Sequence, residues 1–511
     1  MSDVLSKFLN KENIDETKKA LHKALELGID FKLRDEVINF KDFDECFKTF
    51  NEPFPQGGME LNDLLDDINV NLLPHSINFA SPYSMAFPDA GNSQAGLVAV
   101  IISNLLNQNL INWLPCAPVA TVIEIIVLNW LRELVGYSVI DNPTSPMDAG
   151  GFVTTGGVSS NTIAQLLARE SIYPDAMTKG LAECKNIVSI VPNGIDHYSS
   201  RLAMGWLGLG ESNVIKAPTK NFKYDLPELE KLLDDLDKNG KKVMSLIAYA
   251  GDSRSMTCDN FFELRKLCDK YGIWFHVDGC HGTQLLFSDT LRSKLNGVNL
   301  ADSITFDPHK VMNVPYVISI LLVKDQKKLS LIQRPEDIIT GESHSFGQFT
   351  PLFGTRAFLS LKLYMLFKHI GVKALGQMID RRHEMALLLG EKIEANEKLI
   401  LVNKKIDINS VVFMYLPEAF RGSSGAMLQS QIDFMNSINQ KIQETLLKTG
   451  KVWLHNFLIP DLGNVCGAGE KAILRPLRFM SGNPLITESH IDEMLNLVVE
   501  FGSKIERQCK V

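Results

Sequence analysis

The stretch IWFHVDGCHGTQLLFSDTLRSKLNGVNLADSITFDPHK (273–310) contains two short apolar runs, and each run ends on polar side chains. The first run, IWFHVD (273–278), ends at Asp278, and the second, SITF (303–306), is followed at once by Asp-Pro-His and Lys310. Runs of this kind are typical of strands that are buried on both faces. Because ligand sites in open α/β sheets form beyond the carboxyl ends of the strands, we expect Asp278 and Lys310 to share one site.

Similar runs alternate with helical patterns from about residue 150 to residue 325. Further strands are expected at NIVSIV (186–191), VMSLIAYA (243–250) and VISILLV (317–323). Helical segments at 227–239 and 260–271 lie between the strands, and each is followed by a glycine, as helix C-termini often are. The alternation predicts an α/β fold with a large, mostly parallel sheet that helices cover on both faces.

Three parts of the chain differ in pattern. Residues 1–90 combine helices with a passage rich in Pro, Gly and Asn, INFASPYSMAFPDAGN (77–92). Residues 91–370 hold the large sheet domain. In residues 371–511 a long helical stretch is followed by short strands and a final helix from Thr487, which predicts a smaller C-terminal α/β domain.

The composition is that of an ordinary globular protein. Of 511 residues, 45% are apolar and 22% are charged. A chain of this length and apolar content can form one large hydrophobic core and at least one smaller domain. The formal net charge is −8, and no long run of Lys and Arg offsets it. This charge argues against a nucleic-acid partner and against an anionic membrane surface, so a small-molecule partner is expected.

Targeting signals and cysteine pairs are also informative. Residues 1–30 lack the basic and apolar regions of a signal peptide. The apolar run at 95–106 is shorter than the ~20 residues of a membrane span, and it is predicted to be a buried helix. The eight cysteines show no CxxC pairing, so no disulfide framework or zinc site is expected. These features predict a cytoplasmic protein.

A glycine pair opens another predicted helix in GGFVTTGGVSSNTIAQLLARE (150–170). Free backbone N–H groups and the helix dipole at such a start suit a phosphate. A plain turn is the commoner role of a Gly-Gly pair before a helix. The motif also has neither the GK[ST] ending of a P-loop nor the GxGxxG of a dinucleotide site. The phosphate site is therefore a hypothesis that depends on the other motifs.

The two strand ends carry groups of complementary chemistry. A carboxylate such as Asp278 can pair with a protonated ring nitrogen, although a turn aspartate before Gly279 is the commoner arrangement. His276 and His281 flank it, but no third ligand set accompanies them, so no metal is expected. Lys310 in a desolvated pocket would have a lowered pKa and could form an imine, whereas a solvated surface group is the commoner role of a lysine.

In this order, the three motifs resemble those of the group II pyridoxal-phosphate-dependent amino-acid decarboxylases, which include the glutamate, aromatic amino-acid and histidine decarboxylases. The similarity runs from about Pro74 to the C-terminal helix, and it includes SPYSMAFP (81–88), CAPVATVIEIIVLNWL (116–131), DHYSSRLAMGWLGLG (196–210) and LRFMSGNPLIT (477–487). The resemblance implies the PLP-dependent transferase fold (fold type I), pyridoxal 5′-phosphate as cofactor, and a homodimer with the active site at its interface. It also implies decarboxylation of an L-amino acid to its amine through an external aldimine and a quinonoid intermediate.

The same resemblance assigns roles in holding the cofactor. Lys310 is similar to the lysine that carries the cofactor, Asp278 to the partner of the pyridinium nitrogen, and His197 to the histidine that stacks on the ring. A satisfied histidine at a helix start is the alternative for His197. Further cofactor contacts are expected from Val158, Ser159, Ser253, His309 and Thr355. The last of these lies in GTR (354–356), which is similar to a motif of the archaeal tyrosine/aspartate decarboxylase and sphingosine-phosphate lyase branch, and it would reach the phosphate across the dimer.

The chain departs from the family pattern at several positions. Gly279 replaces an alanine that packs on the ring. In AGDS (250–253), Asp252 would lie close to the ring or point to solvent. Phe87 and Asp89 are expected at the substrate, and an Asp89 that faces the pocket would favour a substrate with a second amine or cationic group.

The predicted active-site loop at 333–353 contains no tyrosine, although many relatives use one to protonate the substrate carbon. His344 is the candidate proton donor, with a solvent-facing histidine as the alternative. The missing tyrosine leaves oxidative deamination to an aldehyde, Cα–Cβ lysis and transamination open beside decarboxylation. A non-catalytic cofactor-binding relative is a further alternative, but one that would not need Lys310, Asp278 and His197 together.

Overall fold

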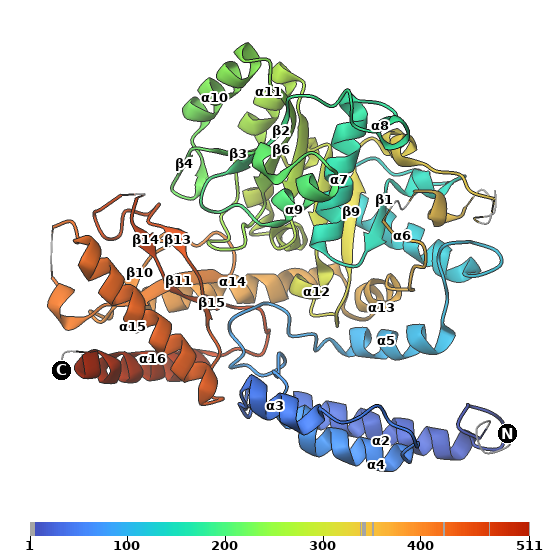
Figure 1. Ribbon diagram of the computed structural model, residues 1–511, viewed down its shortest axis with the longest axis horizontal. Coiled ribbons are helices and arrows are strands. Elements are labelled where there is room, and N and C mark those ends of the chain that lie inside the picture. The colour runs from blue at the N-terminus through green and yellow to red at the C-terminus, as the bar shows by residue number, and fades with distance from the viewer. Residues whose placement is uncertain are drawn as a thin grey trace.

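The computed structural model describes residues 6–337, 339, 344–349, 352–422, 425–469 and 471–509. Figure 1 shows a large α/β part at the top, a smaller part with the C-terminal helices at the left, and the N-terminal helices along the bottom.

The large part is built on a seven-stranded sheet of order β1-β9-β8-β7-β6-β2-β3. Its strands are β1 (Gly151–Thr154), β2 (Ile187–Pro192), β3 (Val214–Ala217), β6 (Lys242–Tyr249), β7 (Trp274–Asp278), β8 (Ser303–Phe306) and β9 (Ser319–Val323). Strands β8, β7, β6, β2 and β3 pair in parallel, whereas β9 is antiparallel to both β8 and β1. The prediction of a large, mostly parallel sheet is confirmed.

Helices cover both faces of this sheet. The four main ones are α6 (Pro118–Val135), α7 (Gly157–Ile172), α10 (Leu226–Lys238) and α11 (Phe261–Tyr271). Every residue of β7 is buried, and its side chains alternate between two cores. Phe275 and Val277 lie in the core shared with α6, α10 and α11, while Trp274 lies in the core shared with α7.

Local capping explains where the predicted helices begin and end. The carboxylate of Asp225 accepts a hydrogen bond from the N–H of Glu228 at the start of α10. The side chain of Asn260 does the same for Glu263 at the start of α11. Gly272, with φ +66°, ends α11 in the left-handed conformation that favours glycine.

The smaller part contains a four-stranded antiparallel sheet of order β10-β11-β15-β12. Its strands are β10 (Leu399–Leu401), β11 (Ser410–Tyr415), β12 (His455–Asn456) and β15 (Leu477–Met480). Helices α14 (Val372–Glu394), α15 (Gln429–Lys448) and α16 (Glu488–Cys509) accompany them. The apolar run at 472–480 forms two strands, β14 (Ile473–Leu474) and β15, because Pro476 between them has no N–H to donate.

The N-terminal residues form α2 (Ile14–Lys32), α3 (Phe43–Phe50), α4 (Leu61–Asp67) and α5 (Gln94–Leu106). The prediction that 95–106 is a buried helix is wrong in one respect. The small residues of α5 are buried against the rest of the protein, but Val98, Ile102 and Leu105 are exposed. These three lie on one face of the helix, at spacings of four and three residues. In the described part of the chain, no helix is long and apolar enough to cross a membrane.

Candidate active site

Six strands of the large sheet, all except β9, end at the same edge. Strands β1, β2, β6, β7 and β8 all run in one direction, so the segments that follow them meet there. These segments enclose a cavity of about 530 Å³, which we call the catalytic cavity. Its position beyond the carboxyl ends of parallel strands is the one that the sequence predicts.

Most of the predicted site residues line this cavity. They are Phe87, Asp89, Val158, Ser159, His197, Ser253, Asp278, His309 and Lys310. They come from six separate segments of the chain, so the fold brings together residues that are up to 223 positions apart, from Phe87 to Lys310 (310 − 87). The two other predicted residues, His344 and Thr355, are not among the lining residues of the described chain.

Lys310 forms a buried ion pair with Asp307. Lys310 lies in the short helix α12 (Pro308–Val311), and its Nζ is 2.8 Å from Oδ2 of Asp307, which is 1% exposed. Burial acts to lower the pKa of Lys310, but the negative charge of Asp307 outweighs it and raises the pKa above its usual value. The expectation of a lowered pKa is therefore wrong, because a carboxylate stabilises the ammonium.

Asp278 is held as a carboxylate by several donors. It is 6% exposed, and it accepts hydrogen bonds from Asn161 Nδ2 at 2.8 Å, the Cys280 N–H at 3.2 Å and Thr305 Oγ1 at 3.3 Å. Burial alone would raise the pKa of Asp278. The neighbouring His197 and the hydrogen bond from Cys280 hold it below its usual value instead. Asp278 is thus ionised and suited to pair with a cation.

His197 is connected to Asp278 through Asn161. The ring Nδ1 of His197 lies 2.8 Å from Ser199 Oγ, and Asn161 Nδ2 donates both to Ser199 Oγ and to Asp278. Burial lowers the pKa of His197, so its ring is neutral at pH 7. Sequence reasoning missed Asn161, although it stands one residue beyond the GGVSS turn.

His276 is a structural residue rather than a metal ligand. Its Nε2 donates to Asn161 Oδ1 at 3.0 Å, and its Nδ1 accepts from Ser303 Oγ at 2.8 Å, so both ring nitrogens are satisfied. Among the residues that the structure describes, no group of three or more His, Cys, Asp and Glu side chains could hold a metal ion.

The start of α7 forms a cradle in the cavity lining, where a Cβ atom on Gly156 would have no atom within 4 Å. A Cβ atom on Gly157 would lie 2.7 Å from Cys280 Sγ and 2.9 Å from Asp307 Oδ2, so only glycine fits there. Val158 and Ser159 follow in the first turn, where backbone N–H groups have no partner within the helix. This arrangement suits an anionic group such as a phosphate.

Asp89 faces the cavity beside Tyr316. It is 8% exposed, and none of the described residues makes a hydrogen bond to its Oδ1. Burial raises the pKa of Asp89, while the charges of Lys310 and His309 and an interaction with the Tyr316 hydroxyl partly oppose the rise. Tyr316 stands six residues after Lys310, but nothing in the sequence marks it as a site residue.

Arg478 supplies a buried cation to the same cavity. Its guanidinium donates to the carbonyl oxygens of Ala86, at 2.9 Å, and Ser253, and its Cζ lies 5.5 Å from the centroid of the Phe87 ring. The Nε atom has no hydrogen-bond partner among the described residues. Burial lowers the pKa of Arg478 to about 10, so it stays charged at pH 7. Arg478 belongs to the motif LRFMSGNPLIT (477–487), but the motif alone does not predict that Arg478 reaches the cavity, because this depends on where β15 lies in the fold.

Two departures from the family pattern have structural explanations. Asp252 is fully buried, and its carboxylate accepts from the N–H groups of Arg254, Ser255 and Thr257 at 2.7 to 2.8 Å. It therefore shapes its own loop and points neither to solvent nor into the cavity. At Gly279, a Cβ atom would lie 2.8 Å from the carbonyl oxygen of Thr305, which explains why alanine is absent there.

His344 and Thr355 lie away from this cavity. The ring of His344 packs against Trp113 at 5.2 Å between centroids, and its Nε2 lies 3.2 Å from the carbonyl oxygen of Pro143. Thr355 is exposed. The role expected of Thr355 is a contact across a dimer, so this role stays a prediction. The role of His344 as proton donor stays a prediction as well.

The residues of the cavity fit the cofactor that the resemblance implies. An ionised Asp278 can hold a proton on a pyridine nitrogen, and Lys310 carries an amine for an aldehyde. The start of α7, where Gly156 faces open space, can take a phosphate, and the neutral ring of His197 lines the same cavity.

Comparison with known proteins identifies the family. The model of the pyridoxal-dependent decarboxylase conserved domain matches residues 44–416. The chain is 26% identical over 471 residues to L-2,4-diaminobutyrate decarboxylase from Acinetobacter baumannii, covering 88% of this chain and 85% of the relative. It is also 26% identical over 477 residues to aromatic-L-amino-acid decarboxylase from Bacillus atrophaeus, covering 91% and 90% of the two proteins.

Solved structures show the same fold. Mouse CSAD in its apo form superposes with a TM-score of 0.85 at 22% identity, covering 95% of this chain and 99% of that one. Oryza sativa TDC, solved with PLP and tryptamine, gives 0.83 at 20% identity, covering 98% and 100%. With the family match and the fold in agreement, the chain belongs to the pyridoxal-dependent decarboxylases, and it is a carboxy-lyase that uses pyridoxal 5′-phosphate.

Proposed function

We propose that this enzyme decarboxylates an L-amino acid whose side chain carries a second cationic group. The observation that carries the proposal is Asp89, a buried carboxylate in the catalytic cavity whose Oδ1 has no hydrogen-bond partner among the described residues. A buried polar group without a partner is costly, so a ligand that supplies a charged donor would gain affinity there. The relative from Acinetobacter baumannii is named for a diamino acid, which agrees with this choice.

Arg478 is proposed to orient the α-carboxylate of the substrate. It is a cation in the same cavity, and its Nε lacks a partner among the described residues. Which bond at Cα breaks depends on which one is held perpendicular to the cofactor plane, so a fixed cation that sets the position of the carboxylate selects the reaction. Arg478 and Asp89 would then hold the two charged ends of one substrate.

The remaining residues are assigned to holding and tuning the cofactor. Lys310 attaches it, Val158 and Ser159 bind its phosphate, and His309 and Ser253 contact it from the sides. When bound, pyridoxal phosphate supplies a cationic ring that accepts the electron pair left by the departing carboxylate. Asp278 keeps a proton on the ring nitrogen, and His197 covers the ring and excludes water.

After CO₂ leaves, Cα must gain a proton, and two donors are proposed. His344 is the donor that the sequence favours, reaching the cavity from a partner subunit. Tyr316 is the second, because it lines the catalytic cavity and its hydroxyl interacts with Asp89. Burial and the charge of Asp89 raise the pKa of Tyr316. Its hydroxyl therefore keeps its proton at neutral pH.

A homodimer is proposed as the working form. The apolar face of α5 that is formed by Val98, Ile102 and Leu105 is not covered by any residue that the structure describes, and burying it against a second copy would remove it from water. Thr355 is exposed and would reach the phosphate held by the other chain. We place the enzyme in the cytoplasm, where the free thiols of its eight cysteines would stay reduced.

The proposal is tested with the purified holoenzyme and a panel of L-amino acids, measuring CO₂ and amine. We expect both products in equal amounts from L-2,4-diaminobutyrate. L-Norvaline has a methyl group in place of the second amine and is the matched control, which should react far more slowly. No CO₂ from any amino acid would contradict decarboxylation, and equal turnover of norvaline would contradict the cationic substrate class.

A further inference from the structure

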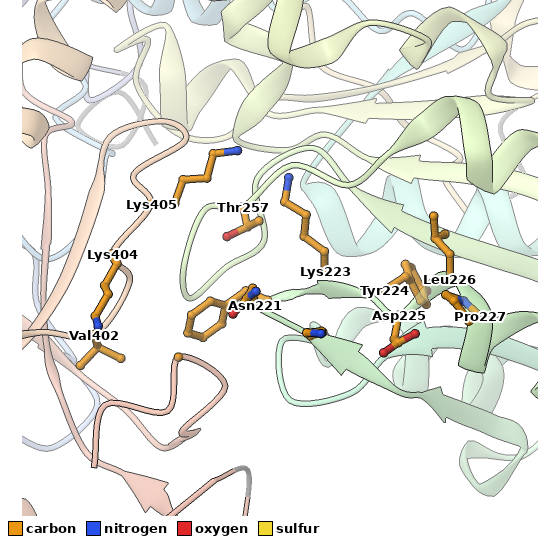
Figure 2. Close-up of a pocket in the computed structure, with 13 residues that line it drawn as sticks. Asn221, Lys223, Tyr224, Asp225, Leu226, Pro227, Thr257, Val402, Lys404 and Lys405 are labelled. Atoms are coloured by element: carbon orange, nitrogen blue, oxygen red, sulfur yellow. The ribbon is translucent and has the colours of Figure 1, made fainter. Parts of the chain in front are cut away.

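A second cavity, of about 820 Å³, lies outside the active site (Figure 2). One wall is the hairpin of β4 (Thr219–Lys220) and β5 (Lys223–Tyr224), with the start of α10, and the other is the chain that follows β10. Among the described residues, it shares no lining residue with the catalytic cavity. We call it the lysine cavity, because it is lined by Lys220, Lys223, Lys404 and Lys405.

The two walls are held together by an aromatic anchor. Phe222 at the tip of the hairpin is buried in a core that also contains Val402 and Met414 of the smaller part. Both Asn221 and Phe222 have positive φ values, +50° and +62°, and a bulky residue rarely adopts this conformation. Strained backbone of this kind persists only where the surroundings impose it. The cavity is therefore a built feature of the fold rather than a gap between loose segments.

Positive charge is in excess around this cavity. Asp407 is 4% exposed, and three ammonium groups surround its carboxylate: Lys405 at 3.4 Å, Lys223 at 3.6 Å and Lys294 at 4.0 Å. Burial lowers the pKa of Lys294, and the charges of Lys405 and Lys223 lower it further, against the opposing effect of Asp407. One carboxylate thus does not balance the three cations.

Two more lysines add to this excess. Lys220 and Lys404 line the cavity and form no ion pair with any described residue. The acidic group of the lining, Asp225, already accepts the N–H of Glu228 as a helix cap. Figure 2 shows Lys404 and Lys405 on the wall opposite Lys223 and Asn221. A cationic cavity also stands out on a chain whose formal net charge is −8.

We propose that the lysine cavity binds a small polyanion that carries phosphate groups. Its volume is that of a small-molecule site. Lysine ammonium groups act as point charges that suit phosphate oxygens, whereas carboxylates are matched best by the planar fork of arginine, and the described lining contains no arginine. Because its walls come from both parts of the chain, a ligand there would stabilise the folded state by mass action.

The test uses the holoenzyme saturated with its cofactor, so that the phosphate cradle of the active site is filled. Inorganic pyrophosphate is titrated by calorimetry at constant ionic strength, and the Tm is measured with and without it. We expect one site per chain and a rise in Tm. In the double variant Lys404→Gln, Lys405→Gln, the Kd should weaken at least tenfold, roughly the effect of losing two charged contacts.

A matched control separates the site from overall charge. Lys327→Gln, Lys328→Gln removes two adjacent exposed lysines that line neither cavity, with the same change in net charge. Its Kd for pyrophosphate should equal that of the wild type. Lys220→Gln, on the opposite wall, should weaken binding as well. Cofactor absorbance and the Tm without ligand show that each variant is folded.

Three results would overturn the proposal. Pyrophosphate could give no binding heat and no rise in Tm. Both double variants could weaken binding equally, which would indicate attraction by bulk charge. Citrate could bind as tightly as pyrophosphate, which would exclude a preference for phosphate.

Discussion

Lys310 and Asp307 form a buried ion pair one helical turn apart, with 2.8 Å between Nζ and Oδ2. The pair means that the amine that we propose bonds to the cofactor is held as an ammonium. Asp307 also lies against Gly157 at the phosphate cradle and 3.9 Å from His309 Nε2. Asp307 therefore lies next to both the lysine and the phosphate cradle of the proposed cofactor site.

The variant Asp307→Asn should change how cofactor loading depends on pH. Only the neutral amine of Lys310 can attack an aldehyde, and Asp307 raises the pKa of this group. At pH values below that pKa, the rate at which the wild-type apoenzyme binds the cofactor should increase up to about tenfold for each unit rise in pH. The corresponding plot of rate against pH for Asp307→Asn should be shifted to lower pH. Stopped-flow absorbance after addition of cofactor measures this rate. Asp307→Glu keeps the charge and is the control; superimposable curves for the wild type and Asp307→Asn would contradict the interpretation.

Asp278→Asn should retain the cofactor but lose most of the activity. The amide cannot balance a proton on the ring nitrogen, so the ring withdraws electrons less strongly. We expect kcat to fall by about 100-fold or more, in the range seen when a preorganised electrostatic group is removed. Cofactor absorbance and kcat are measured on the same preparation. A variant with full cofactor and near wild-type kcat would show that Asp278 has no such role.

Asp89→Asn should reduce discrimination between substrates. Loss of a charge-assisted hydrogen bond should lower kcat/KM for a diamino acid roughly 10- to 100-fold, with little change for norvaline. The carboxylate must be ionised to bind a cation, and its pKa is raised by burial. In a plot of kcat/KM against pH, activity of the wild type on the diamino acid should therefore rise as the pH passes the raised pKa of Asp89. Asp89→Asn should not show this rise. Equal losses for both substrates would argue for a general structural effect.

Tyr316→Phe and His344→Ala distinguish the two proton donors. Removing the true donor should lower kcat about 100-fold with little change in KM, in keeping with the size of general acid catalysis. If His344 acts across the dimer, mixing inactive Lys310→Ala chains with inactive His344→Ala chains should restore activity at one site of each mixed dimer. No loss of kcat in either variant would exclude both residues.

Much of the fold could be predicted because buried strands leave a clear signal. The apolar run at 303–306 forms β8 with the predicted bounds. The helix predicted at 227–239 is shifted by one residue from α10, and the helix predicted at 260–271 begins one residue before α11. Short strands such as β1 were missed, because four residues beside a glycine turn carry little periodicity. The exposure of α5 could not be predicted either, since an apolar helix looks the same whether it packs on its own chain or a second one.

The site could be predicted where a motif places a group at a strand end, as for Asp278 and Lys310. Asn161, Tyr316 and Arg478 were missed because their proximity to the cavity depends on how distant segments meet in space. Asp307 could have been recognised, since residues three apart on a helix are neighbours. The predicted pKa shift of Lys310 is wrong for this reason: burial alone lowers the pKa, whereas the carboxylate one turn away raises it.

The attachment of the cofactor to Lys310 is tested most directly by borohydride reduction of the purified protein, followed by mass spectrometry of its peptides. The wild type should show visible absorbance that borohydride bleaches, with the cofactor mass on the peptide that contains Lys310. Lys310→Ala should show neither. A wild type that stays colourless after addition of pyridoxal phosphate, or a label on another lysine, would contradict the account.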